Sequence, residues 1–229
     1  MATLVEIRNL SKVYTRGKER LEVLHSVNLD IEEGDFVALM GPSGSGKSTL
    51  LNLIGGLDSP TGGTLTIGGQ PIHSVADDAL AKWRSANVGF VFQFYNLMPA
   101  LTAQKNVELP LLMTDLGAAQ RKRRAGIALQ LVGLSERANH KPTELSGGQQ
   151  QRVAIARAIV SDPRLIVGDE PTGDLDRQSA TEVLEMLRML NRDHGKTVIM
   201  VTHDASLAAQ YARRTVTMLD GQIVSDTRS

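Results

Sequence analysis

The run Gly41-Pro42-Ser43-Gly44-Ser45-Gly46-Lys47-Ser48 constrains the architecture of this chain more than any other segment. It matches the pattern G-x-x-x-x-G-K-[ST], in which glycines let backbone N–H groups surround a phosphate. A short buried strand is expected directly before it, at 35–40, and a helix directly after it, at 47–54. Such a helix directs its positive end at the anion. This context predicts a loop that binds the phosphates of a nucleotide.

The residues of this loop have separate predicted tasks. Lys47 is expected to bridge the β- and γ-phosphates of ATP, and the Ser48 hydroxyl is expected to bind Mg²⁺. The competing reading is a chance match in a glycine-rich turn, and the flanking strand and helix argue against it. The nucleotide-binding residues predicted here are Gly41, Ser43, Gly44, Ser45, Gly46, Lys47, Ser48 and Thr49.

Two adjacent carboxylates follow a second apolar run, at 165–168. Ligands bind at the carboxyl ends of strands in open α/β sheets, so Asp169 and Glu170 are expected near the phosphate loop. Asp169 is predicted to hold Mg²⁺, directly or through water, and Glu170 to polarise the attacking water as general base. Taken alone, such a pair is more often an exposed turn. Its combination with the phosphate loop favours the catalytic interpretation.

Composition excludes several classes of protein. The 229 residues include 25 Lys plus Arg and 25 Asp plus Glu, so the formal net charge is zero, which argues against a nucleic-acid partner. The absence of cysteine excludes disulfides, thiolate zinc sites and cysteine nucleophiles. The N-terminal stretch is interrupted by Glu6 and Arg8, so it is not a secretory signal. No apolar run reaches the roughly 18–20 residues that cross a bilayer, so any membrane role is expected to act through a partner.

Strand-like and helix-like segments alternate along the chain. Period-two and β-branched runs predict strands at 4–8, 21–31 (with a slip near His25), 35–40, 64–67, 88–92, 164–168, 197–201, 215–219 and 222–225. Asp220-Gly221 predicts a hairpin between the last two. Helices are predicted at 77–84, 149–160, 178–191 and 205–211. The stretch 103–160 is mostly helical in pattern and is interpreted as a lobe inserted into an α/β core.

The sequence Leu-Ser-Gly-Gly-Gln-Gln-Gln-Arg at 145–152 resembles the LSGGQ signature of ABC ATPases. Ser146 and Gln149 also form a capping box at a helix start, so a structural role and a binding role are both expected. A helix that begins in this way exposes N–H donors to an anion. The resemblance implies that this anion is the γ-phosphate of ATP held by the opposite subunit, bound by Ser146, Gly147, Gly148 and Gln149.

The resemblance extends over essentially the whole chain and implies further site residues. Tyr14, expected in a loop, corresponds to the aromatic that stacks on adenine. Gln93 corresponds to the Q-loop glutamine that contacts the metal and the water. Asp176 lies in the segment 173–176, which resembles the D-loop, although an N-cap role is equally expected for it. His203 resembles the switch histidine that contacts the γ-phosphate.

Within the family, the chain is most similar to the ATPases of the macrolide-efflux (MacB) and lipoprotein-release (LolD) group. The segments that carry this similarity are 92–97, 106–111 and 170–173. Gly168 departs from the pattern, because an apolar residue usually stands there, and looser packing is expected around it. Macrolide exporters of this type carry their membrane segment on the same chain, whereas this sequence ends at 229. A separate membrane subunit or an excised domain is therefore expected.

The family implies a P-loop NTPase fold with a RecA-like α/β core, an antiparallel β-subdomain and an inserted helical subdomain. The core is expected at 1–93 and 161–229, and the helical subdomain at 94–160. The implied partners are a second copy, arranged head to tail, and an integral membrane permease that contacts a groove near 93–112. The implied location is the cytoplasmic face of the inner membrane. An ATPase of a signalling complex of the cell-division type, which moves no substrate, remains the alternative.

Overall fold

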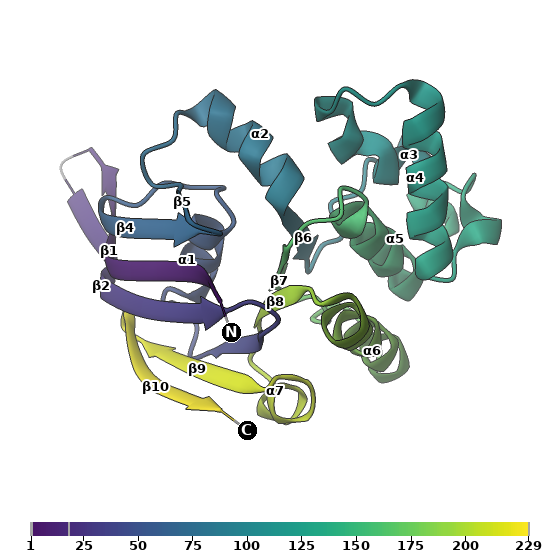
Figure 1. Ribbon diagram of the computed structural model, residues 1–229. Helices are drawn as coiled ribbons and strands as arrows, with labels where there is room; N and C mark the ends of the chain where they lie inside the picture. The colour runs from purple at the N-terminus through teal and green to yellow at the C-terminus, as the bar shows by residue number, and fades with distance from the viewer. Residues whose placement is uncertain (1, 18, 229) are drawn as a thin grey trace.

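The computed structural model describes residues 2–17 and 19–228, which form two β-sheets with helices between and beside them (Figure 1). The larger sheet has the strand order β10-β9-β3-β8-β7-β6 and is parallel except for β10. Its strands are β3 (Phe36–Met40), β6 (Val88–Phe92), β7 (Leu165–Asp169), β8 (Thr197–Val201), β9 (Arg214–Leu219) and β10 (Gln222–Arg228). The central strands are buried on both faces, which explains their unbroken apolar sequences.

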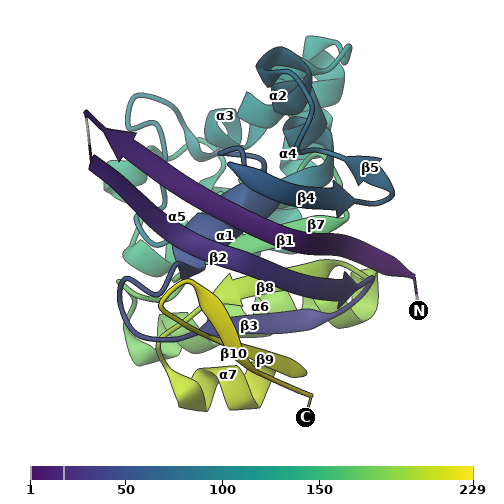
Figure 2. The same cartoon turned by 90° about the vertical axis from the view of Figure 1, so that its left-hand side faces the viewer.

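The smaller sheet is antiparallel and has the order β2-β1-β4-β5. Its strands are β1 (Thr3–Arg16), β2 (Glu19–Glu32), β4 (Gly62–Ile67) and β5 (Gln70–Pro71). Figure 2 shows β1 and β2 as a long twisted hairpin that lies over α1 (Lys47–Ile54). Leu24 and Leu29 of this hairpin belong to the same buried cluster as Leu50 and Leu53 of the helix. The phosphate loop therefore leads into a helix held between two sheets.

The first strand is much longer than predicted, because β1 continues to Arg16 instead of ending at residue 8. Its last three residues, 14–16, are exposed, and they stay extended because they pair with β2 and not because they are buried. Tyr14 consequently lies on a strand opposite Leu21, so its predicted place in a loop is wrong. The predicted slip near His25 is confirmed: the register shifts between Leu10 and Lys12, and Ser26 has a φ of 49°.

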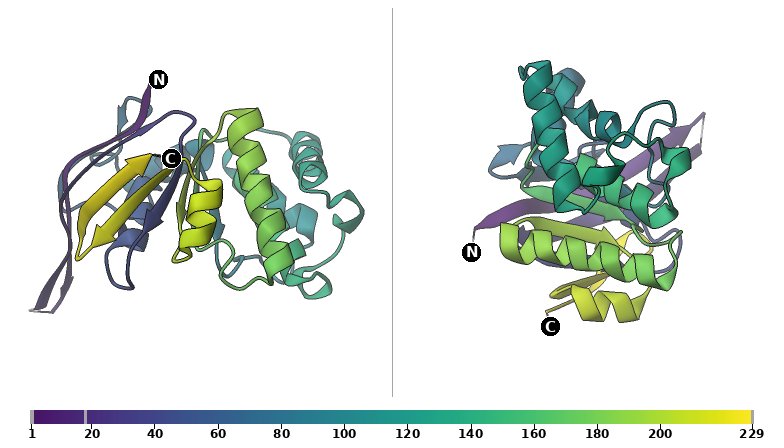
Figure 3. Two further views of the ribbon diagram at one scale, coloured as in Figure 1. Left: turned by 90° about the horizontal axis from the view of Figure 1, so that it is seen from below. Right: turned by 90° about the vertical axis from the view of Figure 1, so that its right-hand side faces the viewer.

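The remaining helices are α2 (Asp77–Asn87), α3 (Ala103–Glu108), α4 (Ala118–Leu131), α5 (Gly147–Ile159), α6 (Arg177–His194) and α7 (Ala205–Tyr211), with 3-10 turns η1 (Leu109–Met113), η2 (Ser135–Arg137) and η3 (Pro142–Glu144). Helices α5, α6 and α7 pack on the face of the larger sheet opposite α1, whereas Leu80 and Trp83 of α2 belong to the buried cluster around α1. Helices α3, α4 and α5 gather at the side remote from the antiparallel sheet (Figures 1 and 3). They lie within 94–160, and the subdomain boundaries themselves stay a prediction. Among the described residues no helix is long and apolar enough to span a membrane.

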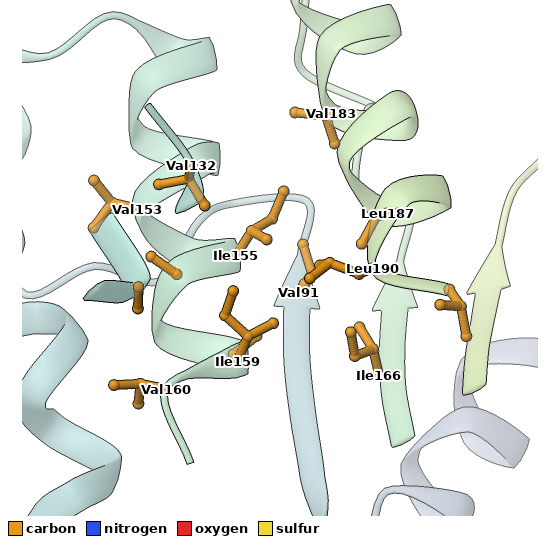
Figure 4. Close-up of a cluster of buried hydrophobic side chains, with 14 of the residues drawn as sticks. Val91, Val132, Val153, Ile155, Ile159, Val160, Ile166, Val183, Leu187 and Leu190 are labelled. Atoms are coloured by element: carbon orange, nitrogen blue, oxygen red, sulfur yellow. The ribbon is translucent and has the colours of Figure 1, made fainter. Parts of the chain in front are cut away.

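Helix α5 joins the helical side of the molecule to the sheet. Figure 4 shows Ile155 and Ile159 of α5 beside Val91 of β6, with Leu187 and Leu190 of α6 over the same strands. The close approach of α5 to β6 requires Gly89, because a β-carbon there would collide with the carbonyl oxygen of Ala158. Helix α5 therefore lies in direct backbone contact with β6 near the start of that strand.

The predicted hairpin at Asp220-Gly221 is confirmed, and an ion pair joins its two strands. Arg214 on β9 donates to both carboxylate oxygens of Asp226 on β10, at 2.8 and 2.6 Å, and to the carbonyl oxygen of Asp30 on β2, at 2.6 Å. The Arg214 guanidinium lowers the pKa of Asp226 below its ordinary value. This arginine thus links the end of the larger sheet to the smaller one.

Asp226→Asn is expected to lower the free energy of unfolding by about 1 kcal/mol at pH 7. The expected effect is small because the carboxylate is 38 % exposed, so water screens the ion pair. A carboxylate whose pKa falls on folding stabilises the fold only while ionised. The difference is therefore present above about pH 4 and disappears as the pH falls through the folded-state pKa. Urea unfolding at pH 7 and pH 3.5 measures it. Asp193→Asn, which breaks a surface pair with Arg192, is the matched control; an equal effect of both substitutions would contradict the assignment.

Candidate functional site

The phosphate loop wraps a cleft of about 350 Å³ at the carboxyl end of β3. Gly41, Gly44 and Gly46 have φ values of 143°, 81° and 95°, a region that glycine adopts without strain. Gly41 has no room for a side chain, because a β-carbon would collide with the carbonyl oxygen of Met218. The cleft is lined by Val23, Gly41, Ser43, Gly44, Gly46, Lys47, Ser48, Thr49, Glu170 and His203. Backbone conformation, together with close approach at Gly41, explains why glycine occupies these loop positions.

Lys47 and Ser45 lie deepest in this loop. The Lys47 ammonium donates to the carbonyl oxygens of Gly41 and Pro42, at 2.9 and 2.8 Å, and its side chain is largely buried. Ser45 is a buried residue of the loop, and its hydroxyl lies 3.5 Å from the Lys47 ammonium. The loop thus holds a single positive charge at the floor of the cleft, where an anionic phosphate would meet it.

A hydroxyl and a carboxylate meet beside the loop. The Ser48 hydroxyl donates to Asp169 Oδ1 at 3.1 Å, across the end of β7. Burial raises the pKa of Asp169, and the Ser48 hydrogen bond opposes that rise. Ser48, Gln93, Asp169 and Glu170 all line one cavity of about 240 Å³.

These oxygen atoms fit Mg²⁺, which takes one or two protein oxygens and completes its shell with phosphate and water. Among the described residues no group of three or more His, Cys, Asp or Glu side chains could hold a metal ion. A site with few protein ligands, completed by nucleotide phosphates, is the arrangement that these donors permit.

Glu170 is held in an unusual conformation at the end of β7. Its φ is 47°, in the left-handed region that costs a non-glycine residue about 1–3 kcal/mol. Its backbone N–H donates to the Val201 carbonyl oxygen at 3.1 Å, and its Oε2 lies 3.2 Å from Nδ1 of His203. The structure therefore brings the predicted base and the predicted switch histidine together at the wall of the phosphate cleft.

The looser packing expected at Gly168 is not observed. Gly168 is buried and pairs with Val91 on one side and Met200 on the other. The ring of Pro171 lies 3.3 Å from the place that a β-carbon would take. The proline ring fills the space next to this glycine, so the strand that carries Asp169 remains well packed.

Gln93 follows β6 and reaches toward the segment that resembles the D-loop. Its Nε2 donates to Asp174 Oδ1 at 2.9 Å, and its side chain lies about 3.0 Å from where a β-carbon of Gly173 would stand. Asp176 caps α6, because its carboxylate accepts from the N–H of Ser179 at 3.0 Å. The N-cap role expected for Asp176 is thereby confirmed, while its role at an interface stays a prediction.

Tyr14 is anchored by two residues to which the sequence analysis gave no role. Its hydroxyl donates to Asp58 Oδ2 at 2.8 Å, and the Lys12 ammonium lies 4.8 Å from the ring centroid and 2.6 Å from Asp58 Oδ1. Burial, and then the bond to Asp58, raise the pKa of Tyr14. Asp58 follows α1 in a Pro- and Gly-containing turn, so nothing local in the sequence connects it with Tyr14. Long-range strand pairing brings them together.

The signature residues are not brought into the phosphate cleft. Ser146 caps α5 by accepting from the N–H of Gln149 at 3.3 Å, while Gln149 Oε1 accepts from the Ser146 N–H at 3.0 Å, so the predicted capping box is confirmed. The helix begins at Gly147, two residues before the predicted start. Gly147 faces the Tyr95 hydroxyl, and Gly148 faces Ser179. None of the four signature residues lines the cavities around Lys47 and Glu170.

A strand that enters a phosphate loop, with paired carboxylates at the end of another strand of the same sheet, makes this chain a P-loop nucleoside triphosphatase. A sequence profile described as ABC transporter matches residues 24–173. The chain belongs to the ABC transporter family.

Known proteins resemble the chain over nearly its full length. It is 47 % identical to the lipoprotein-releasing system ATP-binding protein LolD of Geobacter metallireducens, over 99 % of this chain and 100 % of that protein. It is 48 % identical to the macrolide export ATP-binding/permease protein MacB of Brucella melitensis, over 99 % of this chain but 35 % of MacB. A solved dimer of the ATP-binding cassette MJ0796, in a post-hydrolysis state with ADP and Pi, matches 98 % of both chains at 45 % identity and a TM-score of 0.89.

These likenesses confirm several predictions. The fold is that of an ABC ATPase cassette, and the relationship to the MacB and LolD group is correct. The chain is an ATP-binding and ATP-hydrolysing subunit of an ABC transporter. The roles of individual site residues remain predictions.

Proposed function

We propose that two copies of this chain hold two ATP molecules between them, head to tail, and that hydrolysis drives an integral membrane permease. The observation that carries the proposal is the separation of the signature from the phosphate cleft within one subunit. Ser146 and the following N–H groups lie at an exposed helix start with no phosphate site of their own. A second copy, as in the MJ0796 dimer, would supply the cleft that they complete.

Each chemical task in the composite site would fall to a particular group of this chain. Lys47 would bind the β- and γ-phosphates, and Tyr14 would stack on adenine with the face opposite Lys12. Glu170 would accept a proton from the attacking water, while His203, hydrogen-bonded to Glu170, would contact the γ-phosphate. Ser48 and Asp169 would hold Mg²⁺, with Gln93 in the same cavity. When bound, Mg²⁺ neutralises phosphate charge.

Binding energy would be converted into motion by the γ-phosphate. The signature of one subunit would bind it only while it remains attached to the nucleotide on the other subunit. Hydrolysis removes this shared contact and shifts the population toward the open state. Asp176 caps α6, whose Ser179 lies against Gly148 of the signature, and would lie at the same interface.

The permease would dock in a groove of about 450 Å³ beside the Q-loop. Its lining includes Ala81 and Arg84 of α2, Phe92 of β6, Pro110 and Met113. The exposed apolar side chains of Phe94, Met98, Leu112 and Met113 lie in the same part of the chain. Apolar surface of this kind indicates a protein contact. The chain would therefore sit on the cytoplasmic face of the inner membrane, attached through its permease.

Ser146→Arg is expected to lower ATP turnover by about 100-fold or more and to leave ATP binding to a single subunit unchanged. The long cation would occupy the space that the γ-phosphate of the second subunit must enter, a loss comparable to removing donors from a transition-state site. Steady-state ATPase assays and nucleotide titration measure the two quantities. Thr102→Arg is the matched control, because Thr102 caps α3 in the same way away from the cleft. Near-normal hydrolysis by Ser146→Arg would overturn the composite site.

A further inference from the structure

Gln151 is a fully buried polar side chain on the signature helix α5. Its Nε2 donates to the carbonyl oxygen of Phe92 at 3.1 Å and also to the carbonyl oxygen of Pro171. Its Oε1 has no hydrogen-bond partner among the described residues. A buried, unpaired oxygen costs free energy, and an apolar side chain would avoid that cost. Glutamine is therefore kept here for the two backbone carbonyl groups that its amide N–H groups reach, at the cost of one unpaired oxygen.

The two accepting carbonyl groups belong to the catalytic segments. Phe92 is the last residue of β6 and directly precedes Gln93, while Pro171 directly follows Glu170. The Gln151 amide therefore connects α5 to the peptide units next to Gln93 and Glu170. Because Glu170 has a left-handed φ, its position depends on neighbouring contacts that hold the turn.

A second residue of α5 holds the other side of the Q-loop. Arg157 donates to the carbonyl oxygens of Tyr95 and Asn96, at 2.8 and 2.5 Å, and both of these residues have positive φ. The helix thus contacts the backbone before and after Gln93. Gly89 lets α5 lie directly on β6 at Ala158, the residue after Arg157.

We propose that Gln151 is a positioning residue for hydrolysis, which fixes Glu170 and Gln93 to the signature helix of the same subunit. The inference rests on the proposed function. In a head-to-tail dimer, the signature of one subunit contacts the ATP of its mate. A shift of α5 in one subunit would then move Glu170 of that same subunit through the hydrogen bonds of Gln151. The two ATP sites of the dimer would be coupled in this way. The observation behind this proposal is that α5, the end of β6 and the turn after β7 meet at the Gln151 amide.

The test substitution is Gln151→Met, which keeps the length of the side chain and removes both donors. We expect kcat for ATP hydrolysis to fall at least tenfold, with the KM for ATP and the nucleotide affinity of the single subunit changed less than twofold. The matched control is Asn191→Leu. Asn191 is also a buried amide that donates to backbone carbonyl groups, those of Gly34 at 2.9 Å, Lys196 at 2.7 Å and Asp35 at 3.4 Å, away from the cleft. Its loss should lower thermal stability and leave kcat within twofold of wild type.

A kcat within twofold of wild type for Gln151→Met, or an equal loss in Asn191→Leu, would overturn the proposal. If Gln151→Met does not fold, Gln151→Asn keeps the amide but shortens its reach, and at least a threefold lower kcat is then expected; a wild-type rate would count against it. If the wild-type chain itself hydrolyses no ATP, the proposed function fails and takes this inference with it. Hydrolysis by wild type together with normal turnover by the variant removes the role of Gln151 alone.

Discussion

Glu170→Gln is expected to lower the rate of ATP hydrolysis by about 10³-fold and to trap a stable dimer in the presence of ATP and Mg²⁺. The amide keeps the shape of the side chain and its contact with His203, but it cannot accept a proton from water. Loss of a positioned general base costs about 10²–10⁴-fold. The γ-phosphate then stays between the two subunits, so the closed state persists.

The measurement is size-exclusion chromatography with ATP and Mg²⁺, alongside a steady-state ATPase assay. Glu182→Gln is the matched control, since Glu182 is an exposed carboxylate on α6, where it accepts from Gln178. The control should hydrolyse ATP at the wild-type rate and form no lasting dimer. A Glu170→Gln protein that elutes as a monomer would contradict the dimer, and one that hydrolyses normally would contradict the role of the base.

Lys47→Ala is expected to weaken ATP binding to the single subunit by about 100-fold. The lysine supplies the cation at the floor of the phosphate cleft. A charge-assisted hydrogen bond is worth about 1.5–3 kcal/mol, and more than one such contact to the phosphates would be lost. The loss should be larger for ATP than for ADP, because the predicted contact includes the γ-phosphate.

Isothermal titration of wild type and variant with ATP and with ADP measures this difference. Lys82→Ala, which removes an exposed lysine from α2, is the control for a general change of charge. Since Lys47 also bonds to two carbonyl groups of the loop, thermal unfolding of the variant checks that the loop still folds. Unchanged affinity for ATP would refute the assigned role.

Cargo movement, which depends on the membrane partner, distinguishes a transporter ATPase from a signalling ATPase. The same ATP-driven dimer would serve a permease or a signalling complex. Reconstitution with the membrane partner, and measurement of cargo moved per ATP hydrolysed, decides between them. Either outcome leaves the nucleotide chemistry unchanged.

The features that sequence analysis predicted correctly are local ones. The phosphate loop, the capping box at Ser146, the N-cap at Asp176 and the hairpin at Asp220-Gly221 each depend on a few adjacent residues. Side-chain and backbone hydrogen bonds within such segments join near neighbours in the sequence, so a short pattern of residues is enough to predict them. The strand that carries Tyr14 was predicted too short, because its exposed end at 14–16 has no buried alternation and is extended through pairing with β2.

Adjacent residues alone were enough to specify a nucleotide-binding loop, its acidic partner pair and the start of the signature helix. Tertiary structure was needed to bring Glu170 to His203, Tyr14 to Asp58, and Gln151 to the backbone beside two catalytic segments. These contacts join residues 33, 44, 59 and 20 positions apart, respectively. The order of strands in the sheets and the packing of the helices determine which of these residues meet. Their spacing along the sequence does not predict these contacts.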